Sequence, residues 1–309
     1  MMEMGEYASG GTGELPELFE AAGRVAGSSL QGVSACAGGD INRAWKLRFE
    51  DGTRAFLKSR PGAPAREFEV EAAGLRWLAA AGELPVPTVI GVVDGEQSGL
   101  MLEWIEPGGH LDSTGEENLG RGLARIHRLE ADGFGVLPDG APQGDLKVGP
   151  VSLGDIAEED EGQGFGHCYA RRIEGLVRQA VDRGAVDADQ ATGIGRLCGR
   201  IDEFTGPSEP PARTHGDLWS GNVLVGSDGR PWLIDPAAHG AHRELDLAML
   251  ALFGAPSDRF MGAYREEFPL APGYQDRVEL WQIQPLLIHA ILFGGSYGAA
   301  AARAASSYM

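Results

Sequence analysis

The segment THGDLWSGNVLVGSDGRPWLIDPA, residues 214–237, constrains the fold of the chain more than any other. Two short apolar runs flank a Gly-Ser-Asp-Gly turn, a pattern that predicts a β-hairpin. Asn222 stands at the start of the outgoing strand and Asp235 at the end of the returning strand. A hairpin brings its two ends side by side, so we expect the oxygen atoms of these side chains to converge. Asp217 lies just upstream in the same loop.

Acceptor oxygens with little positive charge beside them suit a hard cation. Magnesium prefers oxygen ligands, takes few of them from protein and completes its shell with water and phosphate. We interpret Asn222 and Asp235 as magnesium ligands and Asp217 as the catalytic base, because H-G-D-x-x-x-x-N followed by Asp matches a phosphoryl-transfer arrangement. The alternative is that these residues only stabilise turns through their own backbone. Gly216 departs from the protein-kinase pattern, which has Arg at this position.

The first hundred residues predict a small sheet-rich lobe. Alternating apolar residues from Trp45 to Phe49, followed by the Asp51-Gly52 turn, indicate a hairpin. A second pair of strands is expected around Asp94-Gly95, and a helix over about 66–80 lies between the two pairs. The inward stripe of this helix is expected to contain the residues Phe68, Ala72, Leu75 and Leu78.

The rest of the chain predicts a mostly helical lobe. Thr114 and Glu117 suggest a capping box at the start of a helix, whereas residues 133–166 form a long irregular connection. Further helices are expected near 167–183, 187–204, 243–253 and 275–304. We therefore predict an α+β, bilobal, protein-kinase-like fold. Its expected parts are a flexible tail (1–14), an ATP-binding N-terminal lobe (15–104) and a C-terminal lobe with the catalytic loop and acceptor site (105–309).

A kinase needs a strand lysine that contacts phosphates and a helix glutamate that holds it. Lys58 ends the second strand, and Glu71 falls on the inward helix face, so we expect these two to pair; Glu67 is the alternative partner. Gly38 and Gly39 would let the backbone approach phosphates closely, although a plain turn explains them equally well.

The strand LMLEW, which runs into IEPGG, suits a connection between lobes. We expect the main chain at Glu103 and Ile105 to bind an adenine edge, because a neighbouring strand would not use these groups.

Composition excludes several other functions. A net charge of −19 over 309 residues disfavours a nucleic-acid partner, since phosphate backbones need a basic face. Three cysteines without metal-like spacing fit a reducing interior, and no redox role is assigned to Cys36. The acidic N-terminus lacks the apolar run of a signal peptide, and no stretch is long enough to span a bilayer. We expect a cytoplasmic protein, not bound to membranes and monomeric.

The chain resembles the fructosamine kinase (ketosamine kinase) family, within the aminoglycoside phosphotransferase and protein-kinase-like superfamily. The resemblance runs from about residue 15 to the C-terminus and is carried by GGDIN, FLK, FEVEAAGLRWL, LGRGLARIHRL, HGDLWSGN, LIDPA and HRELDLAM. It implies magnesium- and ATP-dependent phosphorylation of a sugar hydroxyl in a ketosamine, a repair of glycated amines. By matching position it implies Asp217 as base, Asn222 and Asp235 as metal ligands, and Lys58 with Glu71 as phosphate anchor.

The acceptor side of the site is less well defined. The resemblance implies that Trp219 faces the sugar, although it could instead anchor the loop. His242, Arg243 and Glu244 could reach the acceptor or merely pair with each other. Relatives usually have two aromatic residues where this chain has AHGAHRE, so another acceptor, such as an aminoglycoside, amino alcohol or sugar, stays open. An inactive nucleotide-binding regulatory module is the rival from another class.

Overall fold

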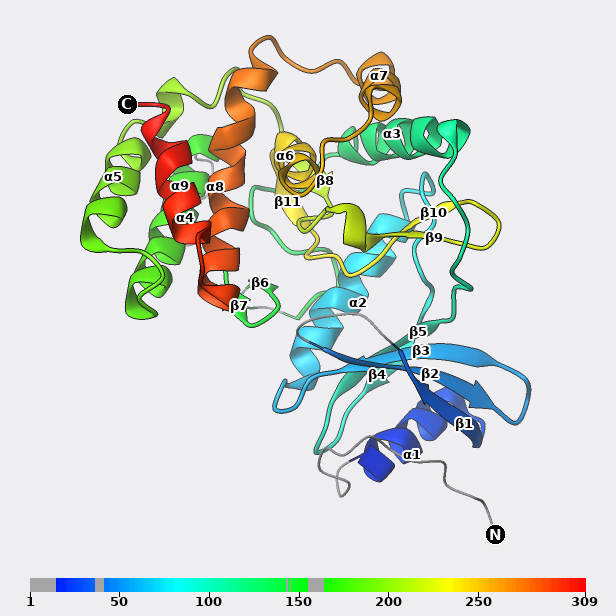
Figure 1. Cartoon of the computed structure of the whole chain (residues 1–309). Coiled ribbons are helices and arrows are strands. Elements are labelled where there is room, and N and C mark those ends of the chain that lie inside the picture. The colour runs from blue at the N-terminus through cyan, green and yellow to red at the C-terminus, as the bar shows by residue number, and fades with distance from the viewer. Residues whose placement is uncertain (1–14, 37–41, 143, 145, 155–163) are drawn as a thin grey trace. The chain divides into compact units, whose positions relative to one another are not determined.

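The computed structural model describes residues 15–36, 42–142, 144, 146–154 and 164–309 (Figure 1). The chain divides into two compact units. The first contains the residues up to Ala72 together with Pro87–Ile105, and the second contains Ala73–Val86 and Glu106–Met309. Within the described residues no helix combines the length and the apolar character that crossing a bilayer requires.

The first unit is built on an antiparallel sheet with the strand order β1-β2-β3-β5-β4. Its strands are β1 (Leu30–Ala35), β2 (Arg43–Phe49), β3 (Arg54–Ser59), β4 (Val89–Val93) and β5 (Gly99–Glu103). Both predicted strand pairs are present. The apolar side of β2 packs against helix α1 (Leu15–Ala26), where the Phe19 and Trp45 rings meet edge to face with centroids 5.6 Å apart. Figure 1 shows α1 beside this sheet.

Helix α2 (Ala65–Ala79) follows the second strand of the first hairpin and contributes residues to both units. The predicted stripe is confirmed, because Phe68, Ala72, Leu75 and Leu78 are all buried. Glu69, on the other face, is exposed. The period of the apolar residues therefore determines which helix face carries Glu71.

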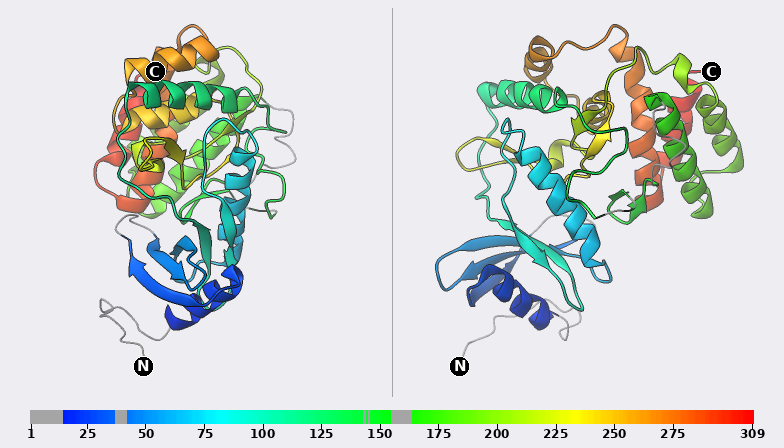
Figure 2. Two further views of the ribbon diagram at one scale, coloured as in Figure 1. Left: turned by 90° about the vertical axis from the view of Figure 1, so that its right-hand side faces the viewer. Right: turned by 180° about the vertical axis from the view of Figure 1, so that it is seen from behind.

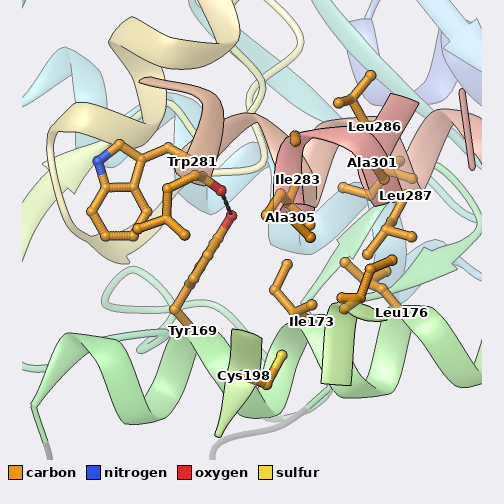
Figure 3. Close-up of a cluster of buried hydrophobic side chains, with 14 of the residues drawn as sticks. Tyr169, Ile173, Leu176, Cys198, Trp281, Ile283, Leu286, Leu287, Ala301 and Ala305 are labelled. Carbon is orange, nitrogen blue, oxygen red and sulfur yellow. Dashed lines mark hydrogen bonds between the residues drawn. The ribbon is translucent and has the colours of Figure 1, made fainter. Parts of the chain in front are cut away.

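The second unit is mostly helical. Its helices are α3 (Ser113–His127), α4 (Phe165–Asp182), α5 (Ala188–Cys198), α6 (Glu244–Leu252), α7 (Asp258–Glu267), α8 (Tyr274–Phe293), α9 (Tyr297–Ser306), and the short η2 (Ile201–Glu203) and η3 (Ser220–Asn222). Helices α4, α5, α8 and α9 enclose the largest apolar core, while α3 packs along α7 (Figure 2). Figure 3 shows Ile173 and Leu176 pointing from α4 into this core.

Three two-stranded sheets connect the helices of this unit. Their strands are β6 (Lys147–Val148) with β7 (Val151–Ser152), β8 (Ala212–Thr214) with β11 (His239–Ala241), and β9 (Val223–Val225) with β10 (Pro231–Leu233). The predicted hairpin is present as β9 and β10, in which Leu224 faces Trp232. In the other pair Thr214 faces His239, so the AHG sequence lies beside the strand that leads to Asp217.

Several local expectations were wrong. The stretch expected as one helix over 275–304 is two, because Gly294 and Gly295 both have φ near +65° and end α8. Asp112, rather than Thr114, caps α3 by accepting a hydrogen bond from the Gly115 amide at 2.8 Å. Helix α7 was not expected, and the irregular connection contains the β6–β7 pair.

Helix α8 is interrupted by Pro285, which has no amide hydrogen to donate. One turn earlier, the Tyr169 hydroxyl from α4 donates to the Leu280 carbonyl at 2.7 Å and accepts from the Gln284 amide at 3.3 Å (Figure 3). These are the two groups that a regular helix joins directly. The Tyr169 hydroxyl therefore bridges the backbone of α8 just before the proline.

Candidate active site

The loop that carries Asp217 is held through its backbone by a buried carboxylate. Asp246, in the first turn of α6, accepts hydrogen bonds from the His215 amide at 2.7 Å and from the Gly216 amide at 2.9 Å. Its Oδ2 atom is also 3.1 Å from Nε2 of His127, whose Nδ1 is 2.7 Å from the Tyr264 hydroxyl. Both oxygens of one side chain thus set the path of the loop.

The surroundings lower the pKa of both Asp246 and His215. Burial alone would raise the pKa of Asp246, but the hydrogen bond and charge of His127 and the His215 amide outweigh it, so that pKa is lowered. Burial lowers the pKa of His215, which keeps this imidazole neutral. His215 Nε2 is 2.9 Å from the Ile234 carbonyl, and its Nδ1 accepts from the Asp217 amide at 3.3 Å. His215 therefore braces the loop against the hairpin.

Gly216 is required by the backbone at its position. Its φ is +81°, a region that side chains rarely adopt. A Cβ atom there would lie well within 3.0 Å of the Ala237 carbonyl oxygen. The departure from the protein-kinase pattern therefore has a steric cause, because no arginine could occupy this place.

Asn222 joins the Asp217 loop to the hairpin. Its Nδ2 donates to the Asp217 carbonyl at 2.7 Å and to Oδ2 of the Asp217 carboxylate at 3.2 Å. Its own carbonyl accepts from the Ile234 amide at 3.0 Å. These bonds fix the orientation of the amide group, so Oδ1 is directed away from Asp217. An oxygen held in this way is suited to coordinate a cation.

Asp235 lies two residues after the end of the returning strand β10. It is the single non-glycine residue with positive φ, 53°, in the part of the chain that the structure describes. Such a conformation costs free energy and persists where the surroundings impose it, commonly at functional sites. Pro236 follows it and restricts the backbone further.

The two oxygen donors of Asn222 and Asp235 suit magnesium better than a metal whose ligands all come from protein side chains. Among the described residues no group of three or more His, Cys, Asp or Glu side chains is suited to hold a metal ion. Asn222 and Asp235 supply two oxygen donors on adjoining segments, and magnesium typically takes one or two carboxylates plus waters and phosphate.

The predicted pairing of Lys58 with Glu71 is present in the first unit, while its role toward phosphates stays a prediction. Lys58 Nζ lies 2.5 Å from Oε1 of Glu71, and the two side chains are 4% and 16% exposed. Glu67, the alternative partner, forms its ion pair with Arg60 instead. A buried lysine that is paired with a carboxylate is held in one place.

The expectation for the connecting strand needs a correction. The Glu103 amide is not open to a ligand, because it donates to the Thr88 carbonyl at 2.9 Å. The Ile105 amide lies beyond the end of β5 and donates no hydrogen bond to any other described residue. Gly38 and Gly39 lie outside the described residues.

A cavity in the second unit opens onto Asp217. Its wall also includes His239 of β11 and a stripe of α8 that contains Gln284, Pro285, Ile288 and His289. Trp219, which is 37% exposed, lies two residues after Asp217, and its ring centroid is 5.8 Å from that of Phe253. Phe253 in turn contacts His289, with centroids 4.9 Å apart. Aromatic and polar groups therefore surround the carboxylate.

The comparisons with known proteins agree with this arrangement. A family model described as fructosamine kinase matches residues 20–309. The chain belongs to the fructosamine kinase family. One relative, "Probable ketoamine kinase" of Enterococcus faecium, is 33% identical over 268 residues, which are 86% of this chain and 91% of the relative. The crystal structure of a candidate fructosamine-3-kinase from Thermobifida fusca is 36% identical, with a TM-score of 0.81, and the match covers 94% of this chain and 98% of that one.

More distant structures share the fold. An aminoglycoside phosphotransferase in complex with ADP and hygromycin B is 18% identical, with a TM-score of 0.59 over 94% of this chain and 97% of that one. The predicted protein-kinase-like α+β fold is thereby confirmed. Membership of the fructosamine kinase family identifies the chain as a phosphotransferase that acts on an alcohol group, as the sequence predicted.

In this member of the family, Arg243 and Glu244 each have structural partners. Arg243 binds both carboxylate oxygens of Glu209, at 2.6 and 2.8 Å, and Glu244 binds Arg277 at 2.6 and 2.9 Å. The two do not pair with each other, and both are at most 3% exposed. Their contact with the acceptor stays a prediction. The two ion pairs are enough to explain why these charged side chains are buried.

His239 and His242 both belong to the AHGAHRE segment, and of the two His239 lines the Asp217 cavity. The His242 ring stacks on Trp281 with centroids 5.3 Å apart. Burial and the neighbouring Arg172 lower the pKa of His239 to about 3, so this side chain is neutral. His239 Nδ1 is 2.8 Å from the Ala237 carbonyl, and Nε2 is 3.0 Å from Nη1 of Arg172.

Sequence reasoning missed the part of the candidate site that α8 supplies. Gln284 and His289 line the Asp217 cavity, and neither was a candidate. A signal was present in the sequence IQPLLIHAILF, where a glutamine, a proline and a histidine interrupt an otherwise apolar run. Polar residues on the buried face of a helix need partners, which makes them candidates for a site.

Proposed function

We propose that this protein transfers the γ-phosphoryl group of magnesium-bound ATP to a sugar hydroxyl of ketosamines, such as fructosyl- or ribulosyl-lysine. Asp217 would orient the attacking hydroxyl and accept its proton. The observation that carries the proposal is the fixed loop itself. Asp217 is tied to Asn222, and Asp235 follows the hairpin in a strained conformation.

Each remaining group has a role in this proposal. Asn222 and Asp235 would hold the magnesium ion, which neutralises charge on the phosphates when bound. Lys58, held by Glu71, would contact the phosphates in the same step. Trp219 would pack its exposed ring against the C–H face of the sugar or against the protonated amine. The chemistry requires little beyond positioning and neutralisation of charge.

The test is ADP formation with fructosyl-lysine or ribulosyl-lysine, compared between the wild type and Asp217→Ala. Removal of a catalytic base lowers turnover by roughly 100- to 10,000-fold. Asp228→Asn is a matched control, because Asp228 lies in the exposed turn of the same hairpin and pairs with Arg230. If Asp217→Ala turned over at the wild-type rate, the assignment would be withdrawn.

Two other functions give different outcomes in the same assay. Turnover of aminoglycosides, amino alcohols or free sugars in preference to ketosamines would keep the chemistry and change the acceptor. Binding of magnesium-ATP without turnover of any acceptor would indicate a regulatory nucleotide-binding module. The unusual AHG sequence beside the cavity is the reason for including the first of these.

A further inference from the structure

The side chain of Gln284 is buried without satisfying its hydrogen-bonding groups. It is 4% exposed, and its Oε1 atom has no hydrogen-bond partner. The whole carboxamide makes no hydrogen bond to any other described residue. The assignment of oxygen and nitrogen in an amide can be exchanged, but either orientation leaves donors and an acceptor unused. A buried polar group in this state destabilises the fold, and Leu or Met at this position would not.

The position of Gln284 allows its unsatisfied carboxamide to contact a group that enters the Asp217 cavity. It lines the cavity that contains Asp217, together with Pro285, Ile288 and His289. These residues form one stripe of α8, since positions three and four apart share a helix face. No neighbouring side chain satisfies the carboxamide, so a group that enters the cavity, either a water or a polar group of a ligand, is the remaining source of partners.

The backbone around Gln284 is fixed from outside the cavity. Its amide hydrogen is bound by the Tyr169 hydroxyl, and the following Pro285 fixes its own φ. The side chain therefore starts from a backbone that packing holds in place. A binding group is most effective when its supporting elements are rigid in this way.

We propose that Gln284 binds a hydroxyl of the acceptor sugar next to the one that is phosphorylated. A carboxamide offers both a donor and an acceptor, as does an alcohol, so one glutamine can satisfy a hydroxyl in either direction. Sugars carry hydroxyls on adjacent carbons, whereas a simple amino alcohol has no second hydroxyl to offer. Gln284 thus selects polyhydroxylated acceptors. This inference rests on the proposed function and refines its acceptor class.

The first measurement is the stability of Gln284→Met, which keeps the volume and removes the polar atoms. An unsatisfied group predicts that the variant melts higher, by about 1–3 °C. Gln282→Met on the same helix is the matched control. The Gln282 Nε2 donates to the Ala248 carbonyl at 3.0 Å, so losing it should lower the melting temperature. A lower melting temperature for Gln284→Met would overturn the inference, because it would show that the carboxamide stabilises the fold.

The second measurement compares a ketosamine with its analogue that lacks the neighbouring hydroxyl. In the wild type, kcat/KM should be roughly tenfold higher for the ketosamine, and Gln284→Met should remove most of this preference. KM for ATP should not change, and Gln282→Met should behave like the wild type. Equal discrimination by Gln284→Met and the wild type would refute the role in recognition. If the wild type formed no ADP with any ketosamine, the proposed function would fail, while the melting comparison would still decide whether Gln284 is unsatisfied.

Discussion

Replacing Asp246 by Asn tests whether this carboxylate holds the catalytic loop. The change preserves shape and keeps one oxygen acceptor, but it exchanges the other for an NH2 group. The His215 and Gly216 amides each bind a different oxygen, and His127 shares one of them. At least one backbone amide must then face a donor. The variant therefore removes a charge-assisted bond and leaves a buried N–H group without a partner.

The size of the effect follows from these contacts. A hydrogen bond to a charged group contributes roughly 1.5–3 kcal/mol, and an orphaned buried donor costs about 1–3 kcal/mol more. Since Asp246 is 1% exposed, solvent cannot compensate. We expect a loss of roughly 3–5 kcal/mol in the free energy of unfolding. For 309 residues this corresponds to a fall in melting temperature of about 5–8 °C.

The assay is urea or thermal unfolding of Asp246→Asn beside Asp258→Asn. Asp258 is an exposed residue in the first turn of α7, so its variant has the same change in charge without the buried contacts. The control should stay within about 0.5 kcal/mol of the wild type. Stability of Asp246→Asn within the same margin would show that the carboxylate does not hold the loop, and our account of the site would be wrong.

The difference in stability between the wild type and Asp246→Asn should depend on pH. The pKa of Asp246 is lowered in the folded protein, so its stabilising contribution is present above the pKa of an unfolded Asp. It is lost as pH falls through the folded pKa. The difference in stability between the wild type and Asp246→Asn should therefore be full at neutral pH and shrink on acidification. A difference that grew on acidification would contradict the direction of the shift.

Two further substitutions test the backbone of the Asp217 loop and the ion pair between Arg243 and Glu209. Gly216→Ala should lower the free energy of unfolding by several kcal/mol, of which roughly 1–2 kcal/mol come from the left-handed backbone alone. The readout is the midpoint of urea unfolding. A midpoint equal to that of the wild type would contradict the clash with Ala237. Arg243→Met should cost at most roughly 3–5 kcal/mol, because Glu209, whose side chain is 18% exposed, is left without its partner. An unchanged melting curve together with a higher KM for the acceptor would instead restore the predicted substrate contact.

The sequence predicted those parts of the site that depend on local pattern. The alternation around Val223–Val225 and Pro231–Leu233 is enough to predict the hairpin, and the hairpin places Asn222 beside Ile234. The helical stripe on α2 likewise places Glu71 on the face toward Lys58. Both inferences need only the period of the apolar residues and the turn residues between them.

The missed parts depend on contacts between distant segments. His127 reaches Asp246 across 119 positions, and no local pattern indicates that pairing. Helix α7 was missed because its buried residues are interspersed with charged ones and a glycine. The sequence marks Gln284 as a polar residue within an apolar run, but only the packing shows that its Oε1 atom has no partner.

The Tyr169 hydroxyl makes the shape of the cavity sensitive to a helix that supplies none of its lining. Helix α4 contributes no residue to the Asp217 cavity, yet its tyrosine holds the backbone of α8 immediately before the residues that do. Substitutions along α4 can therefore shift the lining without altering any residue that contacts the acceptor. During evolution, such remote changes offer a route by which acceptor preference drifts while the phosphoryl-transfer residues stay constant.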